Sequence, residues 1–329
     1  MKIGAWIPSY SWERMDYATA EGIRQFARRA EAIGLDSIWV IDHLLRAPGL
    51  YGVSWLDPLC VLNHVAACTS RIRLGTGILV VPIRHPVLLA KEIATLDYLS
   101  GGRYIFGVGP GWYDREFEVM GTTIKERGAR TDEILAAVRR LLTEPNVTFE
   151  GRFFRFKNVT IDPLPPRLPE IWVSGGSRIP TEKSPDKPFI APTVLQRILH
   201  ADCFLVRNSG RHDWVKRDMQ TAREFVAARG RDPSTLRLGH VQFIYVTETR
   251  DREEAFRLQR PHFERIMGTH RPWPHLQECY LTGTADDMCA RIEDLRAAGL
   301  EYLILGPVST EVSQLDLIAK HILPRFAEA

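Results

Sequence analysis

Two residues that could move a proton stand side by side in the sequence. Asp42 and His43 end an apolar segment that begins at Ser37 and reads SIWVIDH. A histidine can take up or release a proton near neutral pH, as general acid–base chemistry requires. The aspartate could orient the imidazole, or it could simply hydrogen-bond a loop. His43 could therefore exchange a proton or be a satisfied structural residue, and Asp42 could be its catalytic partner or a structural neighbour.

A second group of residues suits a flat ring with polar edges. Glycines allow a ligand to approach the backbone closely, and tryptophans can wall a pocket. Peptide N–H groups in the turn Gly175-Gly176-Ser177 can form an anion nest for a phosphate. Arg178 could clamp that phosphate or be a solvated loop arginine, and the other glycines could merely turn the chain. The candidate cofactor-binding residues are Trp6, Thr76, Gly77, Ile78, Gly109, Gly111, Trp112, Gly175, Gly176, Ser177 and Arg178.

The sequence lacks the residue patterns that metal-dependent hydrolases, serine hydrolases and nucleotide-binding P-loop proteins require. Metal-dependent hydrolases cluster His, Asp and Glu ligands, whereas only one histidine lies at the expected strand ends. His262, His270 and His275 have no ligand spacing, so we expect no metal. The motifs of serine hydrolases and P-loop nucleotide-binding proteins are absent. With 43 basic and 40 acidic residues, the net charge of +3 favours neither nucleic acid nor a membrane as a partner.

These candidates must be positioned by a regular alternation of strands and helices. Eight apolar segments read as strands, and helical segments separate them, which predicts βαβ units and a parallel sheet. Eight such units predict a (β/α)8 barrel, whose active site lies at the carboxyl ends of the strands. The alternative is a doubly wound sheet, but the dinucleotide fingerprint is missing after the first strand. The eight predicted strands are 2–8, 37–42, 74–82, 103–109, 171–176, 202–207, 236–246 and 301–306.

The chain of 329 residues is expected to form a single barrel domain, 1–329, with insertions at about 147–169, 177–192 and 268–283. The insertion at 147–169 reads as a hairpin. Five cysteines occur without a C-x-x-C pair, which favours reduced and mostly buried thiols in the cytoplasm. The N-terminal segment has too short an apolar run for a signal peptide, and no run is long enough to span a membrane.

Several motifs together resemble the bacterial luciferase-like superfamily. They read VIDH, GTGILVVPIRHP, LDYLSGGRYIFGVGPGWYDREFEVMG, ERGARTDEIL and IWVSGGS, and they are densest from Ile38 to Arg130. The chain is most similar to the subgroup of probable coenzyme-F420-dependent oxidoreductases. The resemblance implies a (β/α)8 barrel that uses a flavin or a deazaflavin, and it implies a homodimer packed through helices near strands two and three.

The resemblance also bears on the glycines of the third strand, LGTGILVV. Glycine inside a strand weakens it, so Gly75 and Gly77 predict a bulge or a close approach to the backbone. The family implies a cis peptide bond at Gly77-Ile78 behind the ring, and it places its ring-proximal histidine at His43. Luciferase has an arginine for the flavin phosphate where this chain has Pro110, and a glutamate where it has Gly176. Both departures favour a phosphate site built from backbone.

Three functions remain open at this point. The favoured hypothesis is hydride transfer between F420 and a small organic substrate, with His43 supplying or removing the proton. The alternative is a monooxygenase that uses reduced FMN and O2 on a carbonyl or sulfur substrate. A separate reductase would then supply the reduced cofactor. The third is a barrel that binds a flavin without catalysis, because fold does not determine function. The sequence does not identify the substrate.

Overall fold

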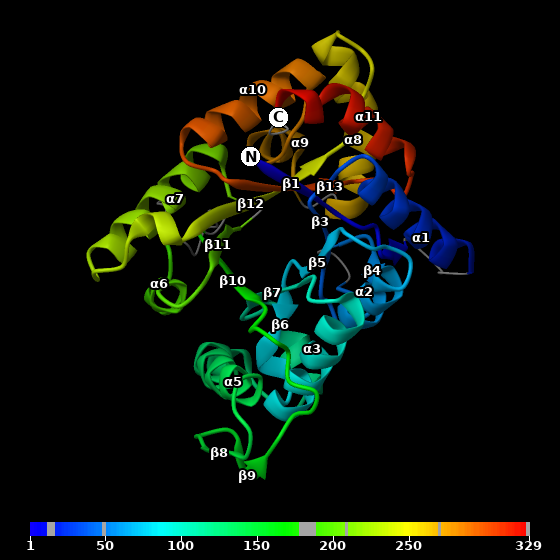
Figure 1. Cartoon of the computed structure of the whole chain (residues 1–329). Coiled ribbons are helices and arrows are strands. Elements are labelled where there is room, and N and C mark those ends of the chain that lie inside the picture. The colour runs from blue at the N-terminus through cyan, green and yellow to red at the C-terminus, as the bar shows by residue number, and fades with distance from the viewer. Residues whose placement is uncertain (12–16, 48–50, 178–188, 208–209, 269–270, 327–329) are drawn as a thin grey trace.

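Eight parallel strands close into a barrel in a computed structural model that describes residues 1–11, 17–47, 51–177, 189–207, 210–268 and 271–326. Each barrel strand pairs with the next barrel strand along the chain, and the last strand, β13, pairs with the first, β1, to close the ring (Figure 1). The strands are β1 (Lys2–Trp6), β3 (Ser37–Val40), β5 (Arg73–Thr76), β7 (Tyr104–Gly109), β10 (Glu170–Gly175), β11 (Cys203–Val206), β12 (Arg237–Ile244) and β13 (Tyr302–Pro307). The predicted (β/α)8 barrel and its eight strand positions are confirmed.

The third barrel strand is broken where the sequence places its glycines. β5 ends at Thr76, and β6 (Leu79–Val80) resumes the pairing with β7 after a cis peptide bond at Gly77-Ile78. Before the break Leu74 pairs with Tyr104, and after it Leu79 pairs with Val108. The register changes by one residue, which is the signature of a bulge. Both the bulge and the cis bond are therefore confirmed.

Aromatic rings fill the inside of the barrel and explain one of those glycines. Trp39 lies against Trp172 with ring centroids 4.7 Å apart, and Tyr302 meets Trp172 edge-on, also at 4.7 Å. A Cβ atom on Gly75 would lie 2.3 Å from the Trp39 ring, closer than any real contact. The group that approaches this stretch of backbone is thus the protein's own indole, because a close-packed interior leaves no room for both.

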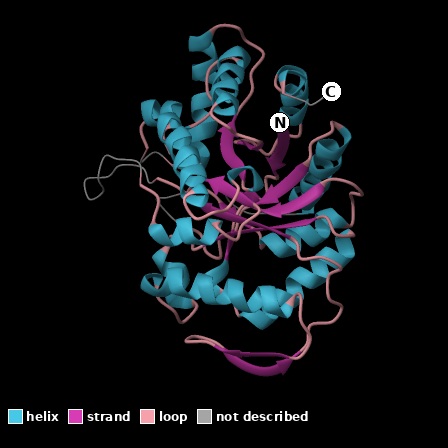
Figure 2. Ribbon diagram, turned by 60° about the vertical axis from the view of Figure 1, so that its left-hand side comes forward, coloured by secondary structure: helices cyan, strands magenta, loops and turns pink. Residues whose placement is uncertain are grey.

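Helices surround the barrel and bury its outer face (Figures 1 and 2). Their starts follow ordinary capping chemistry. In α2, for example, Asp57 accepts a hydrogen bond from the Cys60 N–H and Pro58 occupies the first turn. The helices are α1 (Tyr17–Ala32), α2 (Pro58–Ala66), α3 (Pro86–Ser100), α4 (Asp114–Val119), α5 (Arg127–Leu141), α6 (Pro192–Ile198), α7 (His212–Ala227), α8 (Arg252–Met267), α9 (Trp273–Cys279), α10 (Ala285–Ala297) and α11 (Ser313–His321).

The three predicted insertions differ in how they fold. The first contains the antiparallel hairpin of β8 (Val147–Glu150) and β9 (Arg155–Val159), which Figure 2 shows away from the barrel. Most of the second, residues 178–188, lies outside the described residues. The third contains α9 and returns to the barrel at Leu281, which forms a bridge with Ile244. No helix in the described part of the chain is long and apolar enough to cross a membrane.

We expect Gly107→Ala to destabilise the barrel by about 1–3 kcal/mol, because overpacking a filled core forces backbone shifts. A Cβ atom there would lie 1.9 Å from the Thr76 carbonyl oxygen, which is backbone and cannot turn aside. Chemical denaturation measures the change. Gly22→Ala in α1 is the matched control, since a Cβ there meets nothing within 4 Å. A Gly107→Ala variant as stable as wild type would contradict the packing described for β5 and β7.

Candidate active site

His43 lies just beyond the carboxyl end of β3, and its side chain is buried against a carboxylate. Its Nδ1 is 3.2 Å from Oε1 of Glu116, which comes from α4 and is 1% exposed. The same oxygen accepts the Leu45 N–H at 3.1 Å. A carboxylate oxygen accepts hydrogen bonds, so in this pair Nδ1 is the donor and Nε2 is the ring nitrogen that does not face Glu116. This arrangement can take up a proton at Nε2 and stabilise the resulting charge.

Three aromatic side chains surround His43, and we call Tyr51, Trp55 and Trp112 the aromatic box. Their ring centroids lie 5.5, 4.9 and 5.5 Å from the imidazole centroid, in that order. Tyr51 also meets Trp55 edge-on at 5.0 Å. Such surfaces bind flat, apolar groups and exclude water. Trp112 is among the candidates predicted from the sequence, whereas Tyr51 and Trp55 are not, because they follow β3 in a segment without a recognisable motif.

Asp42 does not contact His43 in the way that a catalytic partner would. Its Oδ2 accepts the Val80 N–H at 2.8 Å and the Arg84 guanidinium at 3.1 Å. Burial raises the pKa of the Asp42 carboxyl, and the Arg84 charge opposes that rise. The structure therefore agrees with the structural alternative for Asp42, in which its carboxylate accepts hydrogen bonds from a neighbouring segment of the chain. The carboxylate beside His43 is Glu116, and the available signal for it was the DREFE segment that follows the glycine-rich turn.

Three predicted glycines lie at or just after the ends of β5 and β7 and are closely packed. A Cβ atom on Gly77 would lie 2.8 Å from Nε1 of Trp6, and one on Gly109 would lie 2.7 Å from Cδ1 of Ile78. Gly111 has a φ of 69°, which favours glycine, and its Cβ would clash with Val80. These positions require glycine for packing or turning. Their contact with a cofactor remains a prediction.

Thr76 uses its hydroxyl inside the barrel wall. The group donates to the Gly107 carbonyl at 2.7 Å and lies 3.2 Å from the Tyr104 hydroxyl, and the residue is completely buried. Its position therefore has a structural explanation that needs no ligand. Because the hydroxyl is already engaged, Thr76 could contact a ligand only through its backbone groups.

The predicted phosphate nest already holds a carboxylate. Asp218 from α7 accepts the Ser177 N–H at 2.6 Å and the Ser177 hydroxyl, also at 2.6 Å. Burial raises the Asp218 pKa, and these hydrogen bonds oppose the rise. A phosphate at Gly175-Gly176-Ser177 would have to displace this carboxylate or use other donors. Arg178 lies outside the described residues, so the nest and its clamp remain predictions.

Trp6 Nε1, Ser9 Oγ and Trp55 Nε1 are buried and have no hydrogen-bond partner among the described residues. Buried polar groups nearly always have partners, so an exception needs an explanation. These three atoms are also shielded from solvent, so a ligand that used them as donors would have to displace the side chains that cover them. In the described part of the chain, no three His, Cys, Asp or Glu side chains gather as metal ligands.

The chain is similar in sequence to known proteins. A family model described as luciferase-like monooxygenase matches residues 1–182. The F420-dependent glucose-6-phosphate dehydrogenase of Amycolatopsis mediterranei is 34% identical over 166 residues, which cover 47% of this chain and 47% of the relative. The FMNH2-dependent dimethylsulfone monooxygenase of Pseudomonas fluorescens is 32% identical over 189 residues, covering 54% of this chain and 51% of the relative. The alignments thus span about half the length of these relatives.

A solved structure resembles the chain over almost its full length. The monooxygenase RslO1 from Streptomyces bottropensis superposes with a TM-score of 0.80 at 26% identity, covering 99% of this chain and 100% of that one. The similarity therefore includes the second half of the barrel, which the family model does not match.

Proposed function

The chain belongs to the luciferase-like monooxygenase family, and we propose that it is an oxidoreductase in which His43 exchanges a proton with a small organic substrate held beside a flavin-type ring. The observation that carries the proposal is the buried His43–Glu116 pair inside the aromatic box. The pair can donate and accept a proton. It lies at the carboxyl ends of the barrel strands, where the active site of this architecture is found.

The favoured cofactor is F420, and FMN is the alternative. Relatives that use each of them share similar identity with this chain. The flat Trp6 indole beside Gly77 supports a site for the ring that both have in common. Pro110 and Gly176 offer no charged side chain at the two positions where luciferase has them, which supports the deazaflavin. Reduced F420 would supply a hydride, whereas reduced FMN with O2 would supply an oxygen atom.

The chain's own residues divide the remaining work. His43 moves a proton at Nε2, and Glu116 orients the ring through Nδ1. The aromatic box keeps water away from the reacting centre and presses a flat substrate against the site. Asp42 and Arg84 tie the end of β3 to β6, which keeps the His43 segment in place.

Titration of the purified protein with FMN and F420, each oxidised and reduced, tests the proposal. Eight tryptophans, of which Trp6, Trp55 and Trp112 lie at the site, should report ring binding by fluorescence. Tight F420 binding with weak FMN binding would support hydride transfer. Tight binding of reduced FMN would support the monooxygenase. Binding of neither would overturn the cofactor assignment, and binding without turnover of any carbonyl or sulfur compound would favour the non-catalytic barrel.

We further propose a cytoplasmic enzyme that works with a separate reductase. All five cysteines are free thiols, and Cys203, Cys279 and Cys289 are buried, which suits a reducing compartment. A mouth that releases its cofactor after each turnover would need another enzyme to reduce it again. Adding an F420 or flavin reductase to the purified protein should therefore sustain turnover beyond one equivalent of reduced cofactor.

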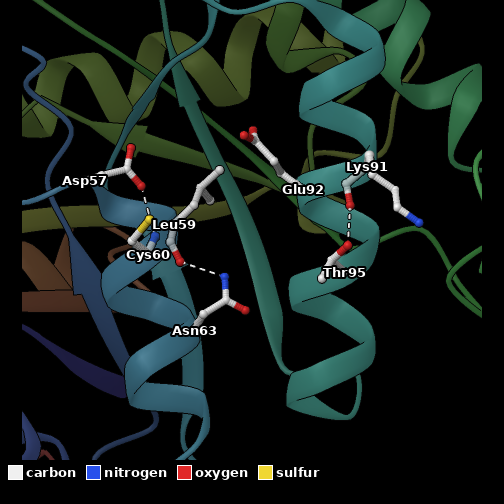
Figure 3. A pocket seen from close by; sticks show the side chains of 7 residues that line it. All are labelled: Asp57, Leu59, Cys60, Asn63, Lys91, Glu92 and Thr95. Atoms are coloured by element: carbon white, nitrogen blue, oxygen red, sulfur yellow. Dashed lines mark hydrogen bonds between the residues drawn. The ribbon is translucent and has the colours of Figure 1, made fainter.

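The exposed face of α3 supports a homodimer. Leu88 and Leu99 are 60% and 62% exposed, and with Glu92 and Thr95 between them they follow the spacing of one helix face. A groove between α2 and α3 runs beside this face and is lined by Asp57, Cys60, Asn63 and Lys91 among others (Figure 3). Exposed apolar residues next to a polar-edged groove are typical of a protein interface. We propose that a second copy of this chain covers it.

The double variant Leu88→Glu, Leu99→Glu should convert the dimer into a monomer, because it replaces the two exposed leucines of the proposed interface with charges that would be buried there. Light scattering after size-exclusion chromatography measures the mass directly. Leu258→Glu on α8 is the control, since that leucine is also exposed, at 40%, but lies on another helix. A monomeric wild-type protein at high concentration would exclude the dimer.

A further inference from the structure

Both hydrogen-bond donors of Ser177 are already engaged within the protein. The Ser177 N–H donates to Oδ2 of Asp218, and the Ser177 hydroxyl donates to Oδ1 of the same carboxylate, each at 2.6 Å. The hydroxyl oxygen in turn accepts the Phe189 N–H at 2.6 Å. Ser177 and Asp218 are 0% and 3% exposed, so water does not compete for these bonds. A phosphate at this turn would therefore find the serine donors occupied.

The Asp218 carboxylate also fills the space beside the turn. A Cβ atom on Gly176 would lie only 2.8 Å from Asp218 Oδ2, so the carboxylate touches the backbone that would have to cradle a phosphate. Gly176 has a φ of 132°, which favours glycine, so no side chain separates the two. Two anions cannot share one set of donors, because like charges at contact distance repel. A phosphate could be seated here only if Asp218 moved away.

Neighbouring elements hold Asp218 in this place. The residue belongs to α7, so the helix backbone fixes the start of its side chain. Burial raises the pKa of the carboxyl, and the hydrogen bonds from Ser177 and the positive charge of Arg207 oppose that rise. The Arg207 N–H donates to the Gly175 carbonyl at 2.7 Å, which ties the turn to β11. Moving Asp218 away would leave a buried charge and two buried donors without partners, and such groups lower stability strongly.

We propose that Asp218 takes the place of the cofactor's phosphate at Gly175-Gly176-Ser177, and that this protein binds its flavin-type cofactor through the ring with little contribution from the phosphate. The inference rests on the proposed function, because it concerns the cofactor of that same site. Charge-assisted hydrogen bonds to a phosphate are strong, so a cofactor held without them leaves the protein more readily. This suits a cofactor that departs after each turnover to be reduced again.

The binding test compares riboflavin with FMN, which differ only in the phosphate. Tryptophan fluorescence measures both dissociation constants, and F420 is compared in the same way with its phosphate-free form, 8-hydroxy-5-deazariboflavin. We expect wild type to bind the two members of a pair within about threefold of each other, because the phosphate gains no new hydrogen bonds. Asp218→Ala empties the turn, and the phosphate form should then bind at least about tenfold more tightly than its partner, as charge-assisted hydrogen bonds allow.

Two control variants separate occupation of the turn from other effects. Asp218→Asn fills the same space without the charge, so it should keep the wild-type ratio of dissociation constants. Asp232 accepts the N–H and the hydroxyl of Ser234 at 2.9 and 2.8 Å, which is the same pair of bonds on the surface, beside the short helix η3 (Pro233–Thr235). Asp232→Ala should therefore bind both forms as wild type does.

Thermal stability provides a readout that needs no cofactor. Asp218→Ala should have a lower Tm than wild type, because the buried Ser177 donors lose their acceptor. Inorganic phosphate, compared with chloride at equal ionic strength, should raise the Tm of Asp218→Ala more than that of wild type or Asp232→Ala. The wild-type ratio of dissociation constants tests the proposal even if Asp218→Ala does not fold.

Three results would overturn the proposal. The first is a wild-type preference for the phosphate form of more than about tenfold, which is the size of a seated phosphate's hydrogen bonds. The second is an Asp218→Ala protein that neither gains this preference nor is stabilised by inorganic phosphate more than wild type. The third is a preference for the phosphate form in Asp218→Asn, because the charge and not the occupation of the turn would then exclude the phosphate.

The same measurements distinguish this inference from the proposed function. If a ring binds but the expectations for Asp218 fail, the proposed function stands and only the assignment of the turn fails. If neither ring binds, the proposed function fails. A selective rise in the Tm of Asp218→Ala with phosphate would then still support Asp218 as the occupant of an anion site, and its absence would overturn that assignment too.

Discussion

Replacing His43 with glutamine should lower turnover at least about 100-fold while cofactor binding stays within a few-fold of wild type, because general acid–base catalysis contributes factors of this size. Glutamine retains a polar side chain of similar length, so the aromatic box keeps most of its packing. His43 is 8% exposed and its Nδ1 already faces Glu116, so Nε2 is the atom available for proton transfer. Single-turnover kinetics with pre-reduced cofactor measures the chemical step.

His64→Gln provides the control for this experiment. His64 lies on α2 and contacts Arg24, so it shares the residue type without the site. Its variant should turn over like wild type. An unchanged single-turnover rate in His43→Gln would remove His43 from the chemistry, and loss of cofactor binding in that variant would reassign it as a binding residue.

The second large effect is expected from Glu116→Gln, which keeps the shape of the side chain and removes its charge. We expect kcat to fall about 10- to 100-fold with little change in the KM for cofactor, because residues that orient a catalytic histidine act on the chemical step. Glutamine can still accept from Leu45 N–H, so the local fold should persist. Steady-state kinetics at several pH values separates the two parameters.

Glu118→Gln is the matched control on the same helix. Glu118 is more than half exposed and pairs with Arg115, so its charge faces solvent. The double variant His43→Gln, Glu116→Gln should be no slower than His43→Gln alone, because a positioning residue has no effect without the residue it positions. Additive losses would contradict the assignment and would indicate that Glu116 acts on the substrate directly.

The sequence alone determined the architecture. Apolar β-branched segments such as SIWV and CFLV, separated by helical stretches, are local patterns, and eight of them leave few ways to bury every strand. The glycines of LGTGILVV likewise predicted a bulge or a close approach in the third strand, because strand glycines need a local reason, and the family resemblance placed the cis bond at Gly77-Ile78. The family motifs added the position of His43 at the mouth. All of these signals lie within short stretches of chain.

Only the tertiary structure decided which groups meet at the site. Asp42 and His43 are neighbours in sequence, but successive side chains of an extended segment point to opposite sides. Asp42 therefore turns to Val80 and Arg84, while His43 meets Glu116, 73 residues further along the chain.

Contacts with segments distant in sequence also explain the other differences between prediction and structure at the mouth of the barrel. The Asp218 carboxylate, from a helix distant in sequence, accepts two hydrogen bonds from Ser177. A turn that reads as an open phosphate nest is thus filled by the protein's own carboxylate. Trp55 comes to His43 through the pairing of two short strands that have no sequence signal. Contacts between segments far apart in the chain depend on how the whole barrel closes, and local patterns do not encode that closure.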